Sequence, residues 1–157
     1  MGTRSTIALE FADGTVEQVY CHWDGYLSNN GEILKAHYMD PYKVRELIDL
    51  GDLSSLRPNI GVAHPFSSFG QDKMTSEEFE KQFGEMCTFY TRDRGEDCPA
   101  RKYKSVDEYF TEGQQEEYDY ILRNINGTAT WFVRCYVTNG AWVEIHEAYA
   151  LQEECVE

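Results

Sequence analysis

Long apolar segments are missing from this sequence. No stretch is apolar and long enough to span a membrane, and the N-terminus lacks the apolar core of a secretory signal peptide. Paired-cysteine motifs are missing too, because the five cysteines are odd in number and widely spaced. This pattern is typical of free thiols in a reducing compartment. We therefore expect a soluble protein of the cytoplasm that does not contact membranes.

Motifs that bind phosphates or metals are also absent. The sequence contains no G-x-x-x-x-G-K-[ST], no G-x-G-x-x-G and no G-x-S-x-G. It contains no C-x-x-C or H-E-x-x-H, and its histidines are far apart in the sequence, at His22, His37, His64 and His146. We therefore predict no metal site and no cofactor.

Positive charge is scarce. The chain has 14 lysine and arginine residues against 28 aspartate and glutamate residues, a formal net charge of -14. Direct binding of nucleic acid needs a basic surface, and anionic lipid headgroups repel an acidic one, so this balance argues against both partners. A basic protein surface would be attracted, although net charge also serves solubility alone.

The sequence does have enough apolar residues for one packed domain. Of its 157 residues, 41% are hydrophobic and 14% are aromatic. A chain of this length forms a core without disulfides or metals. We predict a single α+β domain over residues 1–151, followed by a frayed acidic tail over residues 152–157.

An antiparallel sheet is predicted from two groups of strands. Residues 6–11 and 15–23 form an N-terminal hairpin around Asp13-Gly14, because this dipeptide supplies the positive φ angles of a tight turn. A C-terminal three-stranded meander is predicted from residues 118–123, 130–137 and 142–148, with turns at Asn126-Gly127 and Asn139-Gly140.

Helices are predicted between the two groups of strands. Residues 32–38 have a short apolar face, Asp40-Pro41 begins a helix that Gly51 ends, and Thr75 with Glu78 forms a capping box. Two or three helices from this region should cover one face of the sheet. The remaining elements that we expect are a helical turn at 52–56, a long loop at 57–75, a short strand at 88–92 and a short helix at 106–110.

Candidate catalytic residues lie in segment 20–26. His22 and Asp24 are two residues apart, so on an extended strand they would share a face, and the carboxylate could orient the imidazole as a general base. Cys21 would point to the opposite face, away from His22. The alternative interpretation is a strand that ends in an Asp24-Gly25 turn, with neighbouring aromatic residues packed on the sheet.

Acidic residues cluster in two segments that contain no lysine or arginine. Residues 105–119 hold six acids and residues 144–157 hold five. If the two segments form one face, interleaved with aromatic residues, that face would imitate DNA phosphates and occupy a basic cleft in a salt-sensitive manner. A solvated surface is the alternative. The candidate partner-binding residues are Asp107, Glu108, Glu112, Glu116, Glu117, Asp119, Glu144 and Glu147. The candidate aromatic residues are Tyr109, Phe110, Tyr118 and Tyr149.

Four sequence segments resemble a family of small proteins that bacteriophages and prophages encode. They are Thr3-Arg4-Ser5, Asp13-Gly14-Thr15-Val16, YCHWDGY at 20–26 and LGDLSSL at 50–56. The resemblance covers the first sixty residues, with a looser Tyr/Trp-rich strand pattern near the C-terminus. It implies a phage origin and a location in the host bacterial cytoplasm, and it assigns no catalytic residue. The family's usual proline is replaced by Leu27, so we expect a different turn there.

These features together predict a non-enzymatic inhibitor that binds a basic surface on a host protein or an anti-phage defence protein. One alternative is a small enzyme with its site around His22 and Asp24. Another is a pocket that sequesters a small signalling nucleotide through a local group of basic residues, namely Arg92, Arg94, Arg101, Lys102 and Lys104.

Overall fold

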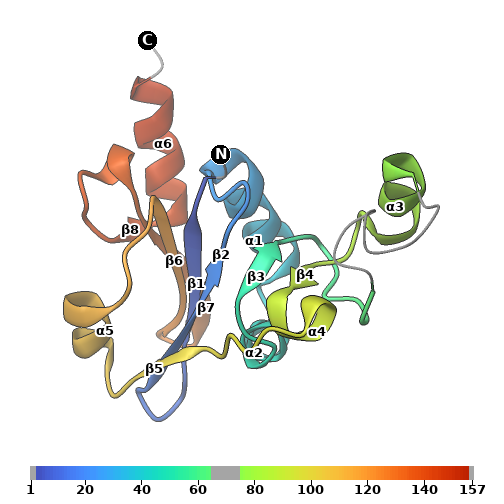
Figure 1. Cartoon of the computed structure of the whole chain (residues 1–157). Helices are drawn as coiled ribbons and strands as arrows, with labels where there is room; N and C mark the ends of the chain where they lie inside the picture. The colour runs from blue at the N-terminus through green and yellow to red at the C-terminus, as the bar shows by residue number, and fades with distance from the viewer. Residues whose placement is uncertain (1–2, 65–74, 156–157) are drawn as a thin grey trace.

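One mixed sheet forms the centre of the molecule (Figure 1). The computed structural model describes residues 3–64 and 75–155, and in this part of the chain eight strands lie in the order β4-β3-β2-β1-β6-β7-β8, with β5 paired to β2. The strands are β1 (Ser5–Glu10), β2 (Val16–Cys21), β3 (Leu53–Ser55), β4 (Thr88–Phe89), β5 (Arg101–Tyr103), β6 (Tyr118–Ile125), β7 (Thr128–Arg134) and β8 (Val143–Glu144). The sheet is mostly antiparallel, which confirms the predicted α+β class.

The N-terminal hairpin is formed by β1 and β2, as predicted. The Phe11 amide donates to the Thr15 carbonyl over 2.8 Å, so the loop holds three residues, and only its last residue, Gly14, has a positive φ, of 89°. Asp13 instead accepts from the amide and the hydroxyl of Thr15, at 3.0 and 2.6 Å. The connection is therefore a three-residue loop closed by an aspartate, where a turn with more than one positive φ was expected.

The C-terminal meander is only partly as predicted. Strands β6 and β7 pair around Asn126-Gly127, whose φ angles of 52° and 86° suit a two-residue hairpin turn. After β7 the chain makes a short 3₁₀ helix, η3 (Tyr136–Thr138), and β8 is followed at once by helix α6 (Ile145–Cys155). The prediction of a strand over 142–148 was wrong beyond Glu144, because Ile145 and Ala148 are buried three residues apart, as on one face of a helix. Residues 152–155, expected in the tail, are part of α6.

Two predictions in the middle of the chain were also wrong. Residues 53–55 form β3 in place of a helical turn, because Leu53 pairs in parallel with Cys21 and its carbonyl accepts from the His22 amide. The strand expected at 88–92 stops after Phe89, and helix α4 (Tyr90–Arg94) follows. The Asp93 carboxylate accepts from the Phe89 amide at 2.8 Å and folds the chain back at that point. Residues 65–74 of the expected loop lie outside the described residues.

Helices lie on both faces of the sheet. Helices α1 (Glu32–His37), α2 (Pro41–Asp49) and α6 bury Leu34, Leu47 and Ala148 in the larger core, while α5 (Val106–Glu112) packs Tyr109 on the opposite face. The prediction of helices on one face therefore holds for α1 and α2, and α5 corrects it. Segment η1, a π-helical turn (Leu27–Gly31), joins β2 to α1, and none of the described helices is long and apolar enough to cross a membrane.

The predicted helix starts are confirmed at three caps. The Asp40 side chain accepts from the amide two residues further along the chain. The side chains of Thr75 and Ser105 accept from the amide three residues further along. These caps begin α2, α3 (Ser76–Phe83) and α5. Each satisfies a backbone donor that the first turn of a helix leaves without an internal partner.

The two hairpins are joined by parallel pairing of β1 with β6. A buried polar junction lies beside this pairing, because the hydroxyl of Thr6 on β1 donates to Asp119 on β6 at 2.6 Å. Asp119 is 1% exposed and also accepts from the Arg134 guanidinium at 3.1 Å and from the Glu116 amide. Burial raises the pKa of Asp119, and the bonds from Thr6, Glu116 and Arg134 oppose that rise. The carboxylate therefore depends on these partners to stay charged.

Replacing Arg134 with methionine should destabilise the fold by about 3 kcal/mol at pH 7, because the Asp119 charge stays buried without its cation. Without the Arg134 charge, which opposes the effect of burial, the folded-state pKa of Asp119 rises further, so the variant takes up this proton at a higher pH than the wild type and the deficit should shrink as the pH falls. Urea unfolding at several pH values measures this. Arg94→Met is the control, because its partner Glu96 is 49% exposed and the loss should be about 1 kcal/mol or less. Equal, pH-independent losses in both variants would contradict the buried-charge account.

Gly51 ends α2 at a close approach between two segments. Its φ is 88°, and a Cβ atom there would lie 2.3 Å from the Cys98 carbonyl oxygen. The next residue, Asp52, donates its amide to that same oxygen at 2.9 Å. The Asp52 carboxylate then accepts from the Tyr20 amide and from Arg101, which ties α2 to β2 and β5.

Gly51→Ala should therefore destabilise the protein more than the same change at Gly14. Both sites have a positive φ, which costs an alanine about 1–2 kcal/mol, but a Cβ at Gly14 would meet no atom within 4 Å. The clash at Gly51 should add about 1–3 kcal/mol. Thermal or urea unfolding of the two variants tests this. Equal losses of stability would show that the Cys98 carbonyl moves away from the added Cβ atom without an energetic cost.

Candidate functional site

His22 lies just past the end of β2, and its side chain bonds to a tyrosine. Its Nδ1 is 2.7 Å from the Tyr20 hydroxyl, two residues back on the same strand face. The Trp23 ring meets the imidazole edge-on with centroids 4.8 Å apart, and Trp23 is 42% exposed. The imidazole is thus half-buried between two aromatic side chains.

Asp24 has a structural role in the turn that follows. Its φ is 56°, its side chain is exposed, and its carbonyl oxygen accepts from the Asn29 side chain and the Asn30 amide. Among the described hydrogen bonds of His22, the side-chain partner is Tyr20 and not Asp24, so the carboxylate that would orient a general base is missing. Cys21 is buried, and burial raises the pKa of its thiol to about 12, which makes it a weak nucleophile.

The basic residues considered for nucleotide binding are held apart by different acids. Arg92 pairs with Asp93, and Arg94 pairs with Glu96. Arg101 donates to Asp52 at 2.7 Å. Each of these three arginines is therefore paired with a different carboxylate. None of the five basic residues lines the cavity next to Leu9 and Leu122.

The predicted partner-binding acids divide into surface and interior groups. Asp107 and Glu112 on α5, Glu117 before β6, and Glu147 on α6 are exposed. The half-buried acids are Glu108, Glu116 and Glu144. Asp119, described above, is buried and bonded to Arg134, so it does not contribute to a surface.

Helix α5 and the β8–α6 junction, which carry acids of the two sequence segments, lie on the same side of the molecule (Figure 1). Phe110 of α5 stacks on Trp142, next to β8, with centroids 5.2 Å apart, which holds α5 beside the β8–α6 junction. The aromatic residues expected between the acids are used in packing instead. Tyr109 and Tyr118 are buried, and Phe110 and Tyr149 are half-buried.

The surface acids have no basic partner within the described part of the chain. The ion pairs there use other acids, which are Glu10, Glu32, Asp52, Asp93, Glu96 and Asp119. Four arginines are engaged by acids that are themselves mostly buried: Arg92, Arg101, Arg123 and Arg134. The uncompensated charge is therefore left on the outer acids, where a cationic partner can reach it.

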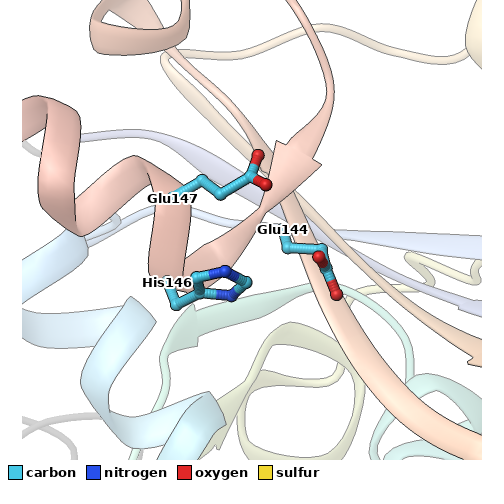
Figure 2. A group of neighbouring side chains, drawn as sticks. All are labelled: Glu144, His146 and Glu147. Atoms are coloured by element: carbon cyan, nitrogen blue, oxygen red, sulfur yellow. The ribbon is translucent and has the colours of Figure 1, made fainter.

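Glu144, His146 and Glu147 form a compact group at the β8–α6 junction (Figure 2). One ligand atom from each lies within 4.8 Å of the others, and two of the three residues are exposed. Two carboxylates and an imidazole could hold a divalent cation, but exposed acids also gather in this way without one. Sequence reasoning missed the group because it searched for separate histidines and cysteines. The signal was Glu-x-His-Glu at the start of a helix.

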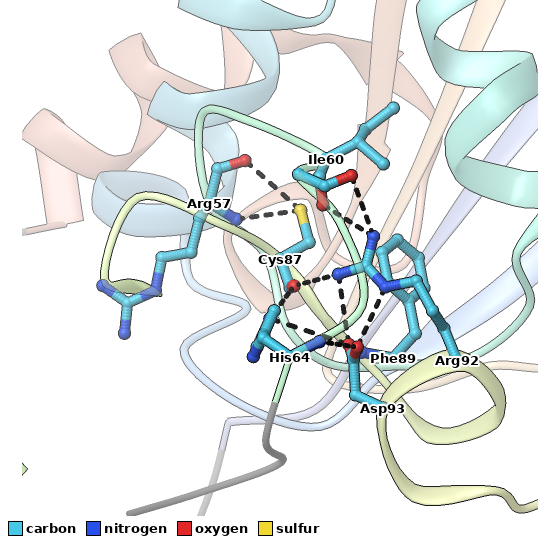
Figure 3. Close-up of polar contacts among 8 residues, drawn as sticks. Arg57, Ile60, His64, Cys87, Phe89, Arg92 and Asp93 are labelled. Carbon is cyan, nitrogen blue, oxygen red and sulfur yellow. Dashed lines mark hydrogen bonds and ion pairs between the residues drawn. The ribbon is translucent and has the colours of Figure 1, made fainter. Parts of the chain in front are cut away.

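A buried cluster around Asp93 was also missed, because its members come from three segments (Figure 3). Asp93 accepts from the amides of His64 and Phe89 and from the Arg92 guanidinium, at 2.8–3.1 Å. Arg92 also donates to the carbonyls of Ile60, Gly61 and Cys87. The cluster fastens the chain before residue 65 to β4 and α4.

The His64–Asp93 pair in this cluster lies in the interior of the protein. Both side chains are 0% exposed, and the His64 Nε2 atom lies 3.0 Å from the Cys87 carbonyl oxygen. The Phe83 ring stacks on the imidazole with centroids 4.9 Å apart. A general base must reach the proton that it removes, and this imidazole is enclosed.

Comparisons with known proteins add no relative to this picture. No protein-family model matches the chain, and neither a curated protein nor a solved structure matches it significantly. The resemblance to phage-encoded proteins therefore stays a prediction from the sequence motifs.

Asp93→Ala should release the segment before residue 65. The variant removes the acceptor of two amides and leaves Arg92 buried without its carboxylate, so we expect a loss of about 3 kcal/mol. Hydrogen exchange at the amides of His64 and Phe89 should accelerate more than exchange in β6. Asp97→Ala, at an exposed neighbouring acid, is the control and should change neither amide. Unchanged exchange in Asp93→Ala would show that the cluster does not hold the segment.

Proposed function

We propose that the protein is a non-enzymatic binding protein that engages a basic surface on another protein. The observation that carries this proposal is the surface group of acids on α5, before β6 and at the β8–α6 junction, none of which has a cationic partner among the described residues. We name this group the acidic surface and define it by Asp107, Glu112, Glu116, Glu117, Glu144 and Glu147.

The acidic surface is suited to rapid and selective encounter. A net charge of -14 steers basic partners, and local acids without internal cations concentrate the field where docking occurs. Contacts at such a surface are screened by salt, so binding should weaken at high ionic strength. The partner that fits best is a nucleic-acid-binding protein of the host or of its anti-phage defences, whose basic cleft the acids would fill in place of phosphates.

The proposed activity is inhibition in the bacterial cytoplasm. An acidic protein that occupies a basic cleft would exclude nucleic acid from it without performing any chemistry. This agrees with the interior placement of the reactive groups. Cys21, His64 and Asp93 are enclosed, and His22 bonds to Tyr20.

Neutralising the acidic surface should weaken capture of such a partner. The variant Asp107→Asn/Glu112→Gln/Glu117→Gln/Glu147→Gln changes four exposed side chains, and we expect roughly tenfold weaker binding, from about 0.3–0.5 kcal/mol for each charge. Immobilised protein, incubated with bacterial lysate and washed at low and high salt, gives the measurement by quantitative mass spectrometry.

The matched control changes four exposed acids on other elements, Glu46→Gln, Asp49→Asn, Glu77→Gln and Glu80→Gln, and so alters net charge equally. It should retain the partner at low salt. Equal losses in the two variants would show that net charge, and not this surface, attracts proteins. Retention by both would contradict the proposed function. A purified partner whose DNA binding is unaffected by the wild-type protein would contradict the DNA-mimic form.

A further inference from the structure

The parallel pairing of β1 with β6 stops before β6 ends. The last paired residues are Leu9 and Leu122, whereas β6 continues to Ile125 and stays paired with β7 as far as Thr128. Beyond Leu9 the first strand turns away into its hairpin loop. The edge of β6 that faced β1 is therefore open over its last three residues, at the end of the sheet that carries both hairpin turns (Figure 1).

Hairpin geometry fixes the direction of the main-chain groups at this open edge. Ile125 and Thr128 flank the two-residue turn, so they exchange hydrogen bonds with each other. The next pair, Asn124 with Ala129, is then a non-hydrogen-bonded pair, whose amide and carbonyl groups point away from the partner strand. The N–H and C=O of Asn124 are consequently directed to the side that β1 has left, and its side chain accepts from Gly127 within the turn.

A cavity of about 690 Å³ occupies this position. Leu9 and Leu122 line it beside Phe11 and Ala129, and Tyr42 at the start of α2 contributes an aromatic ring that is 80% exposed. Its size lies within the range of sites that bury small ligands. The open main-chain groups of Asn124 therefore face a space that can hold a few residues of another chain.

The charged groups of the cavity neutralise each other. Arg123 Nε donates to Glu10 Oε1 at 3.1 Å, and both residues line the cavity. A ligand is therefore not required to bring a charge of either sign into the cavity itself. What the cavity offers is one main-chain donor, one main-chain acceptor, and apolar side chains on one side of them.

We propose that this cavity binds an extended segment of a partner protein, which pairs with β6 at Asn124 and continues the line of β1. In this mode main-chain bonds supply affinity, and alternate side chains of the segment face opposite sides. One side chain would lie on Phe11 and Ala129, the partly exposed apolar residues of the lining, and its neighbours would lie towards the Glu10–Arg123 pair. The net charge of -14 favours a segment with basic flanks.

This site is independent of the acidic surface. It lies at the end of β1 opposite to Glu117, whose carboxylate accepts from the Arg4 amide next to the start of β1. A variant that closes the cavity leaves every residue of the acidic surface in place. Failure of one proposal therefore does not imply failure of the other.

The test uses the full chain, labelled with ¹⁵N, and the peptide acetyl-Lys-Val-Thr-Val-Lys-amide as the probe. At millimolar peptide we expect a saturable shift of the Asn124 amide resonance and slower hydrogen exchange there. The peptide acetyl-Lys-Val-Pro-Val-Lys-amide should bind about tenfold more weakly, because proline removes a main-chain donor and is rejected in strand pairing. Ala12→Trp should fill the cavity and abolish the shift, whereas Ala141→Trp, at an exposed site away from the cavity, should preserve it.

Four outcomes would overturn the proposal. The first is no shift at Asn124 in folded protein at millimolar peptide. The second is equal binding of the two peptides, which means that strand pairing is not used. The third is an equal shift with free valine, which identifies a small-molecule site. The fourth is a shift that depends on protein concentration without peptide, which assigns the edge to a second copy of this chain.

Discussion

The structure depends on one pairing, the parallel contact between β1 and β6, which joins two hairpins made far apart in the sequence. It places Leu9 beside Leu122 on the main core face and Thr6 beside Asp119 on the other. The helices can then cover a continuous surface. The polar junction beside this pairing needs Arg134 to balance the Asp119 carboxylate. The contact between β1 and β6 therefore combines apolar packing with one buried charge, which would destabilise the fold without its partner.

Local rules predicted the elements whose signals are contained within a few residues. Capping side chains gave the starts of α2, α3 and α5, and Asn126-Gly127 gave the hairpin of β6 and β7. The rules failed where a distant partner decides the structure. Leu53 is a strand residue because it pairs with Cys21 at the end of β2, which is distant in the sequence. The parallel pairing of β1 with β6 likewise has no signal in the residues next to either strand. The segment after Trp142, where Val143, Ile145 and Ala148 are interspersed with polar residues, is too short for its periodicity to distinguish strand from helix.

The acidic character of the candidate site could be predicted from the sequence, but the positions of its side chains in space could not. The excess of acid was evident from the sequence, but Asp119 has the same chemical identity as Asp107 and differs only in being buried beside Arg134. The sequence spacing predicted that His22 and Asp24 would share a face. In the structure Asp24 belongs to the turn with a positive φ, and the imidazole of His22 forms its hydrogen bond with Tyr20. The Asp93 cluster draws on segments that no spacing rule connects. Together these pairs engage Arg92, Arg101, Arg123 and Arg134, while the negative sign of the surface follows from the excess of acids over bases in the sequence.

The pairing of β1 with β6 also has a consequence for folding during synthesis. Thr6 and Asp119 are 113 positions apart, so β1 is synthesised long before its central neighbour exists. During that interval the inner edge of β1 is bare, and five of its six residues belong to the interior of the finished protein. Contacts so distant in sequence slow folding, and a bare apolar edge invites pairing with other nascent chains. High expression should therefore favour aggregates that begin at this strand, and slower synthesis or a chaperone that shields the first hairpin should recover folded protein.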